Sequence, residues 1–411
     1  MTMYIKKKLE ELNYKKTTPI QDGVFKAFTH KKHMVGLAPT GTGKTHAYLL
    51  PLFEQIKNHD DQLHAIVLVP TNELVVQVYQ MAKDVDQEIS IKAYYGGSDK
   101  QKEALWLKKN TPQVMITTPE RLNYFLVTEH VLNLKQLKYL ILDEADMMFD
   151  YDFLSMIDVA LTYMQDTKYF LFSATITKAM EPFIKKYFGQ YDFIDTTKAH
   201  QLDITYYLIH LKYQDRLTAL LKLTEHINPF LCFVFVSKKD DQQPIYDAFL
   251  EKGLNAVMLS SNIPFKVRKK RIEDIKDLKY TYVITSDIAA RGLDFKISHV
   301  IHYDLPYHLE FFMHRSGRTG RMYESGLVYT LITNDDTRKI DKLRQKGIPF
   351  ESYEMTNQGL KHVQRKQKEI SEAEKIAIKK VKKPTRVKPN YKKKYQEQVK
   401  KAKKQARRKQ K

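Results

Sequence analysis

The chain has 411 residues, 43% of them hydrophobic, which is enough for two or three domains with buried cores. Its single cysteine excludes an internal disulfide and indicates a reducing compartment, the cytoplasm. No segment reaches the roughly 18–20 apolar residues that span a bilayer, and the first residues lack the apolar stretch of a signal peptide, so we expect no membrane partner. The net charge of +21 is concentrated in residues 361–411, where 22 Lys and Arg face 4 Asp and Glu, a net of +18. This tail predicts a polyanionic partner.

Short apolar runs alternate with helix-compatible segments through most of the chain. The first series covers residues 33–37, 65–69, 91–95, 113–117, 137–142 and 169–172, and the second covers 205–210, 230–236, 255–259, 281–285, 299–303 and 326–332. This alternation is typical of parallel sheets with helices on both faces. We therefore predict two tandem doubly wound α/β domains, residues 1–198 and 204–355, with a polar linker at 195–203 and a basic, flexible tail at 361–411.

A stretch of small residues, 38–45 (APTGTGKT), follows the first apolar run and opens a helix-compatible segment at 47–56. A strand, a loop of small residues and a helix form the setting of a phosphate-binding loop, because backbone N–H groups and the helix N-terminus bind an oxyanion. Lys44 would reach the β- and γ-phosphates, and the Thr45 hydroxyl would ligate Mg²⁺. The motif alone leaves an ordinary surface loop open, since Ala38 stands where the general pattern has Gly. The loop residues predicted to surround the phosphates are Thr40, Gly41, Thr42 and Gly43.

Three acids in four positions, Asp143, Glu144 and Asp146, follow the fifth apolar run. A buried strand that ends in acids places them at the carboxyl edge of the sheet, where open α/β folds bind ligands. Asp143 would hold the Mg²⁺ that bridges two phosphates, and Glu144 would orient and deprotonate the attacking water. The alternative is a helix N-terminus at which the dipole favours acids.

Residues 143–146 read Asp-Glu-Ala-Asp, and the chain resembles the DEAD-box RNA helicases from its first residue to about residue 350, with the motifs in the order of that family. The resemblance implies two RecA-like domains that close on ATP and RNA and so unwind or remodel RNA duplexes. It implies ATP and Mg²⁺ as cofactors and RNA, single-stranded or duplex, as a partner held mostly through its backbone. A compact core with a basic tail is similar to bacterial members that act in ribosome assembly or mRNA turnover. We expect ribosomal or mRNA-decay complexes as partners, and a monomer.

The resemblance also assigns residues that bind and hydrolyse the nucleotide. Gln21, in a Thr-Pro-Ile-Gln segment, would read the adenine, and Tyr4, 17 positions earlier, would cover the base. Asp294 would contact the ribose. Arg318 and Arg321 would be arginine fingers that stabilise the charge on the transferred phosphoryl group.

Two further sets of residues follow from the resemblance. Those that would couple the state of the ATP to the RNA are Ser173, Thr175, Asp146 and His314. Those that would contact RNA are Thr71, Gly97, Thr118, Arg121, Ser237, Arg268, Thr285 and Ser286. Three positions depart from the family pattern, with Asn72 in place of Arg, Glu120 in place of Gly and Phe265 in place of Gln.

Two alternatives stay open. A helicase that acts on DNA would use the same phosphate loop and acids. An ATP-gated RNA clamp or assembly scaffold with little unwinding would follow if the three departures weaken the hold on RNA. Lys44, Glu144, Arg318 and Arg321 favour turnover.

Overall fold

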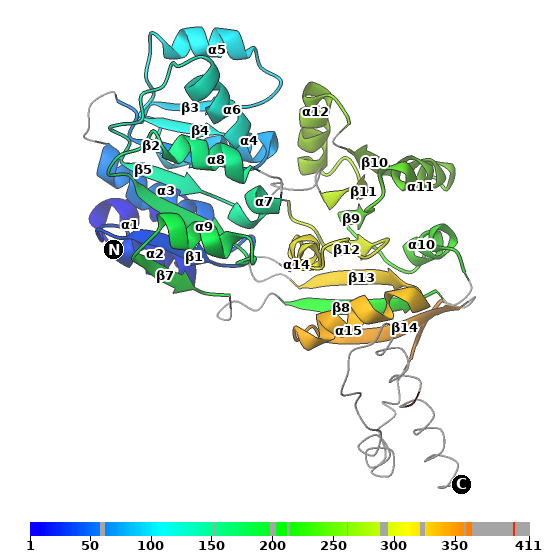
Figure 1. Ribbon diagram of the computed structural model, residues 1–411. Coiled ribbons are helices and arrows are strands. Elements are labelled where there is room, and N and C mark those ends of the chain that lie inside the picture. Colours follow the sequence, from blue (N-terminus) through cyan, green and yellow to red (C-terminus); the bar gives the residue numbers. More distant parts are fainter. Residues whose placement is uncertain are drawn as a thin grey trace. The chain divides into compact units, whose positions relative to one another are not determined.

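The computed structural model describes residues 1–57, 62–150, 153–197, 203–211, 214–260, 262–287, 295–320, 325–356, 359–363 and 398. These residues contain two sheets, each built mainly of parallel strands and flanked by helices, so the predicted fold class is confirmed (Figure 1). Among the helices in these ranges, none combines the length and apolar character needed to cross a membrane.

The first domain contains one seven-stranded parallel sheet in the order β3-β4-β2-β5-β6-β1-β7. Its strands are β1 (His33–Leu37), β2 (Ala65–Leu68), β3 (Ile91–Tyr94), β4 (Val114–Thr117), β5 (Tyr139–Leu142), β6 (Lys168–Ser173) and β7 (Tyr191–Asp195). Its helices are α1 (Met3–Glu11), α2 (Pro19–Ala27), α3 (Lys44–Ile56), α4 (Asn72–Val85), α5 (Lys100–Leu107), α6 (Pro119–Asn123), α7 (Ala145–Asp150), α8 (Leu154–Leu161) and α9 (Met180–Tyr187), with a π-helical turn at Tyr124–Thr128.

Buried strands of this sheet serve two cores, one on each face. In β2, Ala65 and Val67 pack in the core that contains residues of α1 to α4, while Ile66 and Leu68 pack in the core that contains residues of α5, α6, α8 and α9. Because side chains alternate between the faces of a strand, a sheet covered on both sides requires apolar residues at every position. This is why the strands read as continuous apolar runs in the sequence.

The second domain contains an eight-stranded sheet in the order β10-β11-β9-β12-β13-β8-β14-β15. Its strands are β8 (Ile204–His210), β9 (Cys232–Phe235), β10 (Ala256–Leu259), β11 (Tyr282–Thr285), β12 (His299–His302), β13 (Gly326–Ile332), β14 (Phe350–Thr356) and β15 (Gly359–His362). Its helices are α10 (Arg216–Thr224), α11 (Lys239–Glu251), α12 (Phe265–Lys276), α14 (Glu310–Ser316) and α15 (Thr337–Gln345), with a 3₁₀ turn at Asn334–Asp336. The strand pairs are parallel from β10 to β14, and β15 is antiparallel to β14.

Each predicted apolar run forms a strand, whereas β7, β14 and β15 were missed. These three strands lie at or next to sheet edges and are partly exposed, so they lack a continuous apolar run. Strand β15 ends at His362, which corrects the predicted end of the second domain at 355 and the start of the tail at 361. The predicted linker, 195–203, begins at the last residue of β7 and ends just before β8. Its residues 198–202 lie outside the described ranges, as does the tail apart from Lys361 to Val363 and Gln398.

Candidate active site

Three loops of the first domain meet because of the strand order. Strand β6 lies between β5 and β1, so the phosphate loop after β1, the acids after β5 and Ser173 at the end of β6 share the carboxyl edge of the sheet. The backbone N–H of Ala38 donates to the carbonyl of Ser173 at 3.1 Å, which joins the phosphate loop directly to the end of β6. The ligand-binding edge predicted from the sequence is therefore built from neighbouring strands.

Glycine at position 43 allows the segment that contains Gln21 to approach the phosphate loop. Gly41 and Gly43 have φ angles of 77° and 87°, in the region that favours glycine. A Cβ on Gly43 would lie only 2.6 Å from Nε2 of Gln21. The fully buried Gln21 amide donates to the carbonyl of Gly43 at 3.4 Å, and its Oε1 accepts from the N–H of Thr18 at 3.0 Å. Gln21 is thus hydrogen-bonded to the phosphate loop, and its contact with the adenine stays a prediction.

Lys44 lies inside the phosphate loop. Its Nζ donates to the carbonyl of Ala38 at 3.1 Å and lies 3.5 Å from Oε1 of Glu144. The Thr42 hydroxyl donates to the carbonyl of Pro39 at 2.7 Å, which closes the loop further. The structure therefore brings the lysine predicted to bind phosphate together with the predicted general base.

Asp143 is buried and held at both carboxylate oxygens. Oδ1 accepts from the N–H of Glu144 at 2.9 Å, and Oδ2 accepts from the hydroxyls of Tyr48 at 2.9 Å and Thr45 at 3.4 Å. Burial and the charge of Glu144 raise the pKa of Asp143 to about 6, although Lys44 opposes the shift. Sequence reasoning missed Tyr48, but a signal exists: it follows Lys44 by four residues and so lies on the same face of α3.

We predict that Tyr48→Phe lowers the free energy of unfolding by about 1–2 kcal/mol at neutral pH, because a buried carboxylate loses a hydrogen-bond donor. Tyr94→Phe is a matched control: Tyr94 is also buried in the first domain, and its hydroxyl has no hydrogen-bond partner within the described ranges. Its removal should change stability by less than about 0.5 kcal/mol. Urea unfolding of both variants measures the difference, and equal effects would contradict the role given to Tyr48.

Three of the four predicted coupling residues, Ser173, Thr175 and His314, contact the fourth, Asp146. Oδ2 of Asp146 accepts from the Thr175 hydroxyl at 3.0 Å and lies 3.1 Å from Nε2 of His314, which belongs to the second domain. The N–H of Asp146 donates to Oγ of Ser173 at 3.3 Å. Burial opposes ionisation of Asp146, but the charge of His314 and the hydrogen bond from its ring hold the pKa of this carboxyl well below its usual range. The contact joins α7 to α14, and its role in coupling remains a prediction.

A second cluster in the second domain was not predicted. Arg315 is 1% exposed, and its guanidinium donates to both carboxylate oxygens of Asp287 at 2.5 and 2.7 Å, to Oγ of Ser237 at 2.8 Å and to the carbonyl of Asp304 at 2.9 Å. Ser237 also donates to Asp304 at 2.6 Å. One buried arginine therefore ties together the loops that follow β9, β11 and β12.

Of the three residues predicted as arginine fingers or ribose contact, Arg318 lies within the described ranges. Arg318 is buried in the turn after α14. Arg321 and Asp294 lie outside the residues that the structure describes. Their roles remain predictions.

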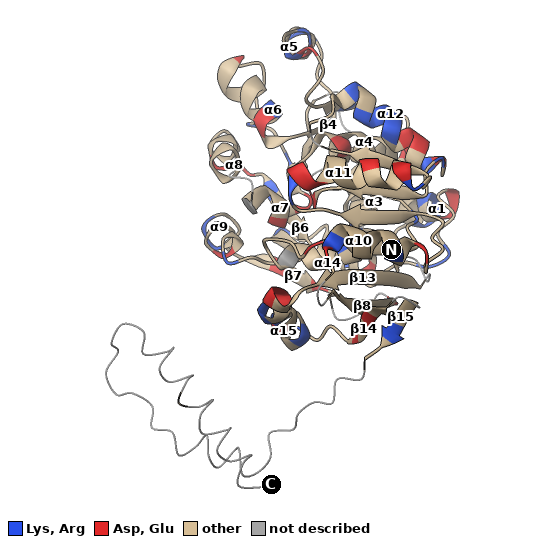
Figure 2. Ribbon diagram, turned by 90° about the vertical axis from the view of Figure 1, so that its right-hand side faces the viewer, with Lys and Arg blue, Asp and Glu red and all other residues tan. Residues whose placement is uncertain are grey.

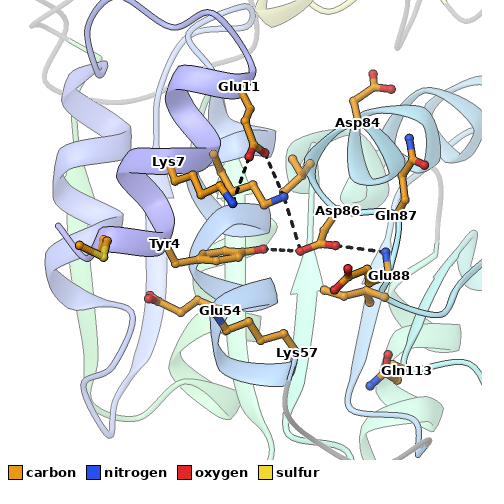
Figure 3. Close-up of a pocket in the computed structure, with 14 residues that line it drawn as sticks. Tyr4, Lys7, Glu11, Glu54, Lys57, Asp84, Asp86, Gln87, Glu88 and Gln113 are labelled. Atoms are coloured by element: carbon orange, nitrogen blue, oxygen red, sulfur yellow. Dashed lines mark hydrogen bonds and ion pairs between the residues drawn. The ribbon is translucent and has the colours of Figure 1, made fainter.

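The structure does not bring Tyr4 to Gln21. Helix α3 has 13 residues and is about 20 Å long. Gln21 contacts Gly43, at the start of this helix, whereas Tyr4 lies at the other end, with its ring centroid 4.3 Å from Nζ of Lys57. The Tyr4 hydroxyl donates to Asp86 at 2.9 Å, and the ring lines a pocket of about 930 Å³ (Figure 3). Because Gln113, just before β4, lines the same pocket, Tyr4 lies at the amino edge of the sheet. The prediction that Tyr4 covers the adenine is wrong.

Most of the predicted RNA contacts have protein partners in the structure. Thr71 and Thr118 are N-caps of α4 and α6, with hydroxyls that accept from the N–H groups of Leu74 at 3.3 Å and Arg121 at 3.4 Å. The guanidinium of Arg121 donates to the carbonyl of Tyr95 at 2.6 Å. These side chains shape the carboxyl edge of the first sheet, and their direct contact with RNA stays a prediction.

The residues of the second domain that were predicted to contact RNA also have partners within the protein. The Thr285 hydroxyl is buried and donates to the carbonyl of Ser286, and Ser237 belongs to the cluster around Arg315. Arg268 forms an ion pair with Glu73 of the first domain.

The donor set fits ATP and Mg²⁺. Oε2 of Glu144 is buried without a hydrogen-bond partner in the described part of the chain, which leaves it available to a water molecule or ligand. Near it, Thr45 and Asp143 offer one hydroxyl and one carboxylate to a cation. Within the same described part, no group of three His, Cys, Asp or Glu could hold a metal ion alone. One hydroxyl and one carboxylate suit Mg²⁺, which proteins bind through one or two carboxylates together with phosphates and water.

Comparisons with known proteins agree with this geometry. Residues 18–183 match the family model of the DEAD/DEAH box helicases, and residues 212–323 match that of the helicase conserved C-terminal domain. The chain is 36% identical to the DEAD-box ATP-dependent RNA helicase CshB of Bacillus subtilis (strain 168) over 415 residues, which cover 97% of this chain and 94% of the relative. It is 34% identical to CshB of Staphylococcus aureus (strain NCTC 8325 / PS 47), over 86% of this chain and 80% of the relative. The structure of S. cerevisiae Dbp5 bound to RNA and ADP BeF3 has a similar fold, with a TM-score of 0.76 and 22% identity over 86% of this chain and 94% of that chain.

Proposed function

The chain belongs to the DEAD-box family of ATP-dependent RNA helicases, and we propose that it remodels RNA duplexes by closing its two domains on ATP and RNA. It is an RNA-stimulated ATPase. The observation that carries the proposed mechanism is the meeting of Lys44, Asp143 and Glu144 at one sheet edge, beside the contact between Asp146 and His314.

Each residue of this edge has a chemical task in the proposal. Lys44 would bind the β- and γ-phosphates, and Glu144, at 3.5 Å from it, would accept the proton of the attacking water. Thr45 and Asp143 would hold Mg²⁺, which supplies positive charge to the phosphate oxygens. Gln21 would hydrogen-bond the adenine from its position against the loop. Arg318 would add charge stabilisation from the second domain.

Closure of the domains would complete this site. Asp146 belongs to the first domain and His314 to the second, so their contact at 3.1 Å requires that the domains be together. The Thr175 hydroxyl donates to the same carboxylate, and Oγ of Ser173, at the end of β6 next to the phosphate loop, accepts from the backbone N–H of Asp146. A change at the phosphates would therefore reach the second domain through the contacts of Asp146 with Ser173, Thr175 and His314.

The RNA backbone would lie along the carboxyl edges of the sheets. Thr71 caps α4, and the first turn of that 14-residue helix presents backbone N–H groups at this edge. Helix N-termini and small hydroxyl residues bind phosphates without reading sequence. We infer little sequence preference for the RNA.

The tail would add a second, nonspecific hold on RNA. Truncation after Val363 keeps β15 whole and removes most of the +18 charge of residues 361–411. We expect weaker RNA binding and a shallower dependence of affinity on salt, because fewer counterions are released. The maximal ATPase rate should stay the same. Filter binding from about 50 to 200 mM salt checks this, and an unchanged salt slope would contradict the role of the tail.

Three further aspects of the biology remain proposals. We propose ribosomal or mRNA-decay complexes as the setting, from the bacterial origin of the most similar relatives reported above. We propose a monomer, and a cytoplasmic location in line with the single, fully buried Cys232. Family membership does not favour the alternative of an RNA clamp with little unwinding.

Steady-state ATPase activity with and without single-stranded RNA tests the proposal, with single-stranded DNA as the control and duplex displacement as the second assay. We expect RNA to stimulate hydrolysis strongly and DNA to have little effect. Strong stimulation by DNA would instead favour the alternative of a helicase that acts on DNA. ATP turnover without duplex displacement would favour the clamp.

A further inference from the structure

The first turn of α12 contacts the first domain through an aromatic ring. The rings of Phe265 and Tyr95 have centroids 5.3 Å apart at an angle of 49°. A Cβ on Gly97 would lie 3.4 Å from Cδ1 of Phe265, so the ring packs against the backbone of this turn. Gly97 has a φ angle of 96°, which a residue with a side chain rarely adopts. The turn therefore offers a flat backbone surface to the ring.

Polar contacts hold both sides of this apolar contact in place. One turn along α12, Arg268 forms an ion pair with Glu73, and its guanidinium lies 5.8 Å over the ring of Phe265. In the first domain, Oδ1 of Asn72 accepts from the N–H of Gly96 at 2.7 Å. Asn72 thus holds the turn against which Phe265 packs, and both are positions at which the sequence departs from the family pattern.

The chemistry of Phe265 differs from that of the Gln expected at its position. A phenyl ring cannot donate the hydrogen bond to a phosphate that a Gln amide could make. Its packing against another aromatic ring and its removal from water both contribute favourable free energy to the contact. Helix α12 is rich in Lys and Arg, as the blue segments in Figure 2 show, and Phe265 is its apolar first residue.

We propose that Phe265 is a positioning residue that holds the two domains closed without RNA. Part of the free energy of closure would then come from the protein itself, and less would be required from RNA binding. This rests on the proposed function, because closure matters to the reaction only if both domains build the ATPase site. The expected consequence is measurable ATP hydrolysis in the absence of RNA and a low RNA requirement.

Phe265→Ala should lower the RNA-free ATPase rate about 10-fold and raise the RNA concentration for half-maximal activity by a similar factor, while the rate at saturating RNA stays the same. Val267→Ala, at an exposed position of the same helix, is the control and should change neither value. Phe265→Gln, which introduces the family residue, should also lose the RNA-free rate.

A double-mutant cycle with Tyr95→Ala separates this contact from a contact with RNA. If the rings act on each other, the second substitution should add little to the first. If the double variant instead shows the product of the two single-variant effects on the RNA requirement, the proposal is overturned. So would an unchanged RNA-free rate in Phe265→Ala.

Closure can be measured without activity. Dyes on engineered cysteines at Lys102 of α5 and Glu251 of α11 would report energy transfer between the domains, since the native Cys232 is fully buried and burial raises its pKa. With ATP and no RNA, Phe265→Ala should lower the closed fraction about 10-fold relative to the Val267→Ala control. Equal closed fractions would overturn the proposal. A chain that closes but does not respond to RNA in the ATPase assay would instead contradict the proposed function.

Discussion

Glu144→Gln is expected to lower ATP turnover by about 10²–10⁴-fold while ATP and RNA still bind. The amide keeps the size and position of the carboxyl group but cannot accept the proton of the attacking water. Oε1 of Glu144 lies 3.5 Å from Nζ of Lys44, and Oε2 has no hydrogen-bond partner in the described ranges, so the free oxygen is the one suited to the water. The substitution therefore removes the base and leaves the phosphate loop intact.

The measurement combines steady-state ATPase assays with equilibrium binding of a fluorescent ATP analogue and of labelled RNA. Glu181→Gln is the matched control, because Glu181 is an exposed acid in the first turn of α9, the helix that follows β6, and the change in charge is equal. It should leave turnover within about twofold of the original chain. Normal turnover in Glu144→Gln would contradict the assignment of the base.

Arg315→Met is expected to destabilise the second domain by about 3–5 kcal/mol. The guanidinium makes four hydrogen bonds while 1% exposed, two of them to the carboxylate of Asp287. Methionine fills part of the volume but leaves Asp287, Ser237 and the carbonyl of Asp304 without their donor. An unpaired carboxylate in a largely buried site is costly, because little water replaces the lost partner.

Thermal or urea unfolding of the two variants Arg315→Met and Arg338→Met measures this cost. Arg338 is exposed on α15, so its substitution changes the net charge equally and should cost less than about 0.5 kcal/mol. Equal unfolding midpoints for the two variants would show that the cluster contributes no stability.

The sequence by itself determined the elements that depend on local pattern. Strands covered on both faces require apolar residues at successive positions, so β1 to β6 and β8 to β13 were visible as runs. The phosphate loop and the acids were visible because their chemistry is packed into a few adjacent residues, and parallel strands bring such loops to one edge. Edge strands such as β7 were missed, because one side of them faces solvent and their apolar residues are interrupted.

Only the tertiary structure decided which distant residues meet. Tyr4 and Gln21 are 17 positions apart in the sequence, yet α1 packs at the far end of α3, so that spacing did not predict their distance. The sequence likewise does not indicate which acid a basic residue will pair with. Arg268 pairs with Glu73 and Arg315 with Asp287, because the fold places a carboxylate within reach and excludes water. Charge and size are properties of a residue, whereas burial and partnership are properties of the packed chain.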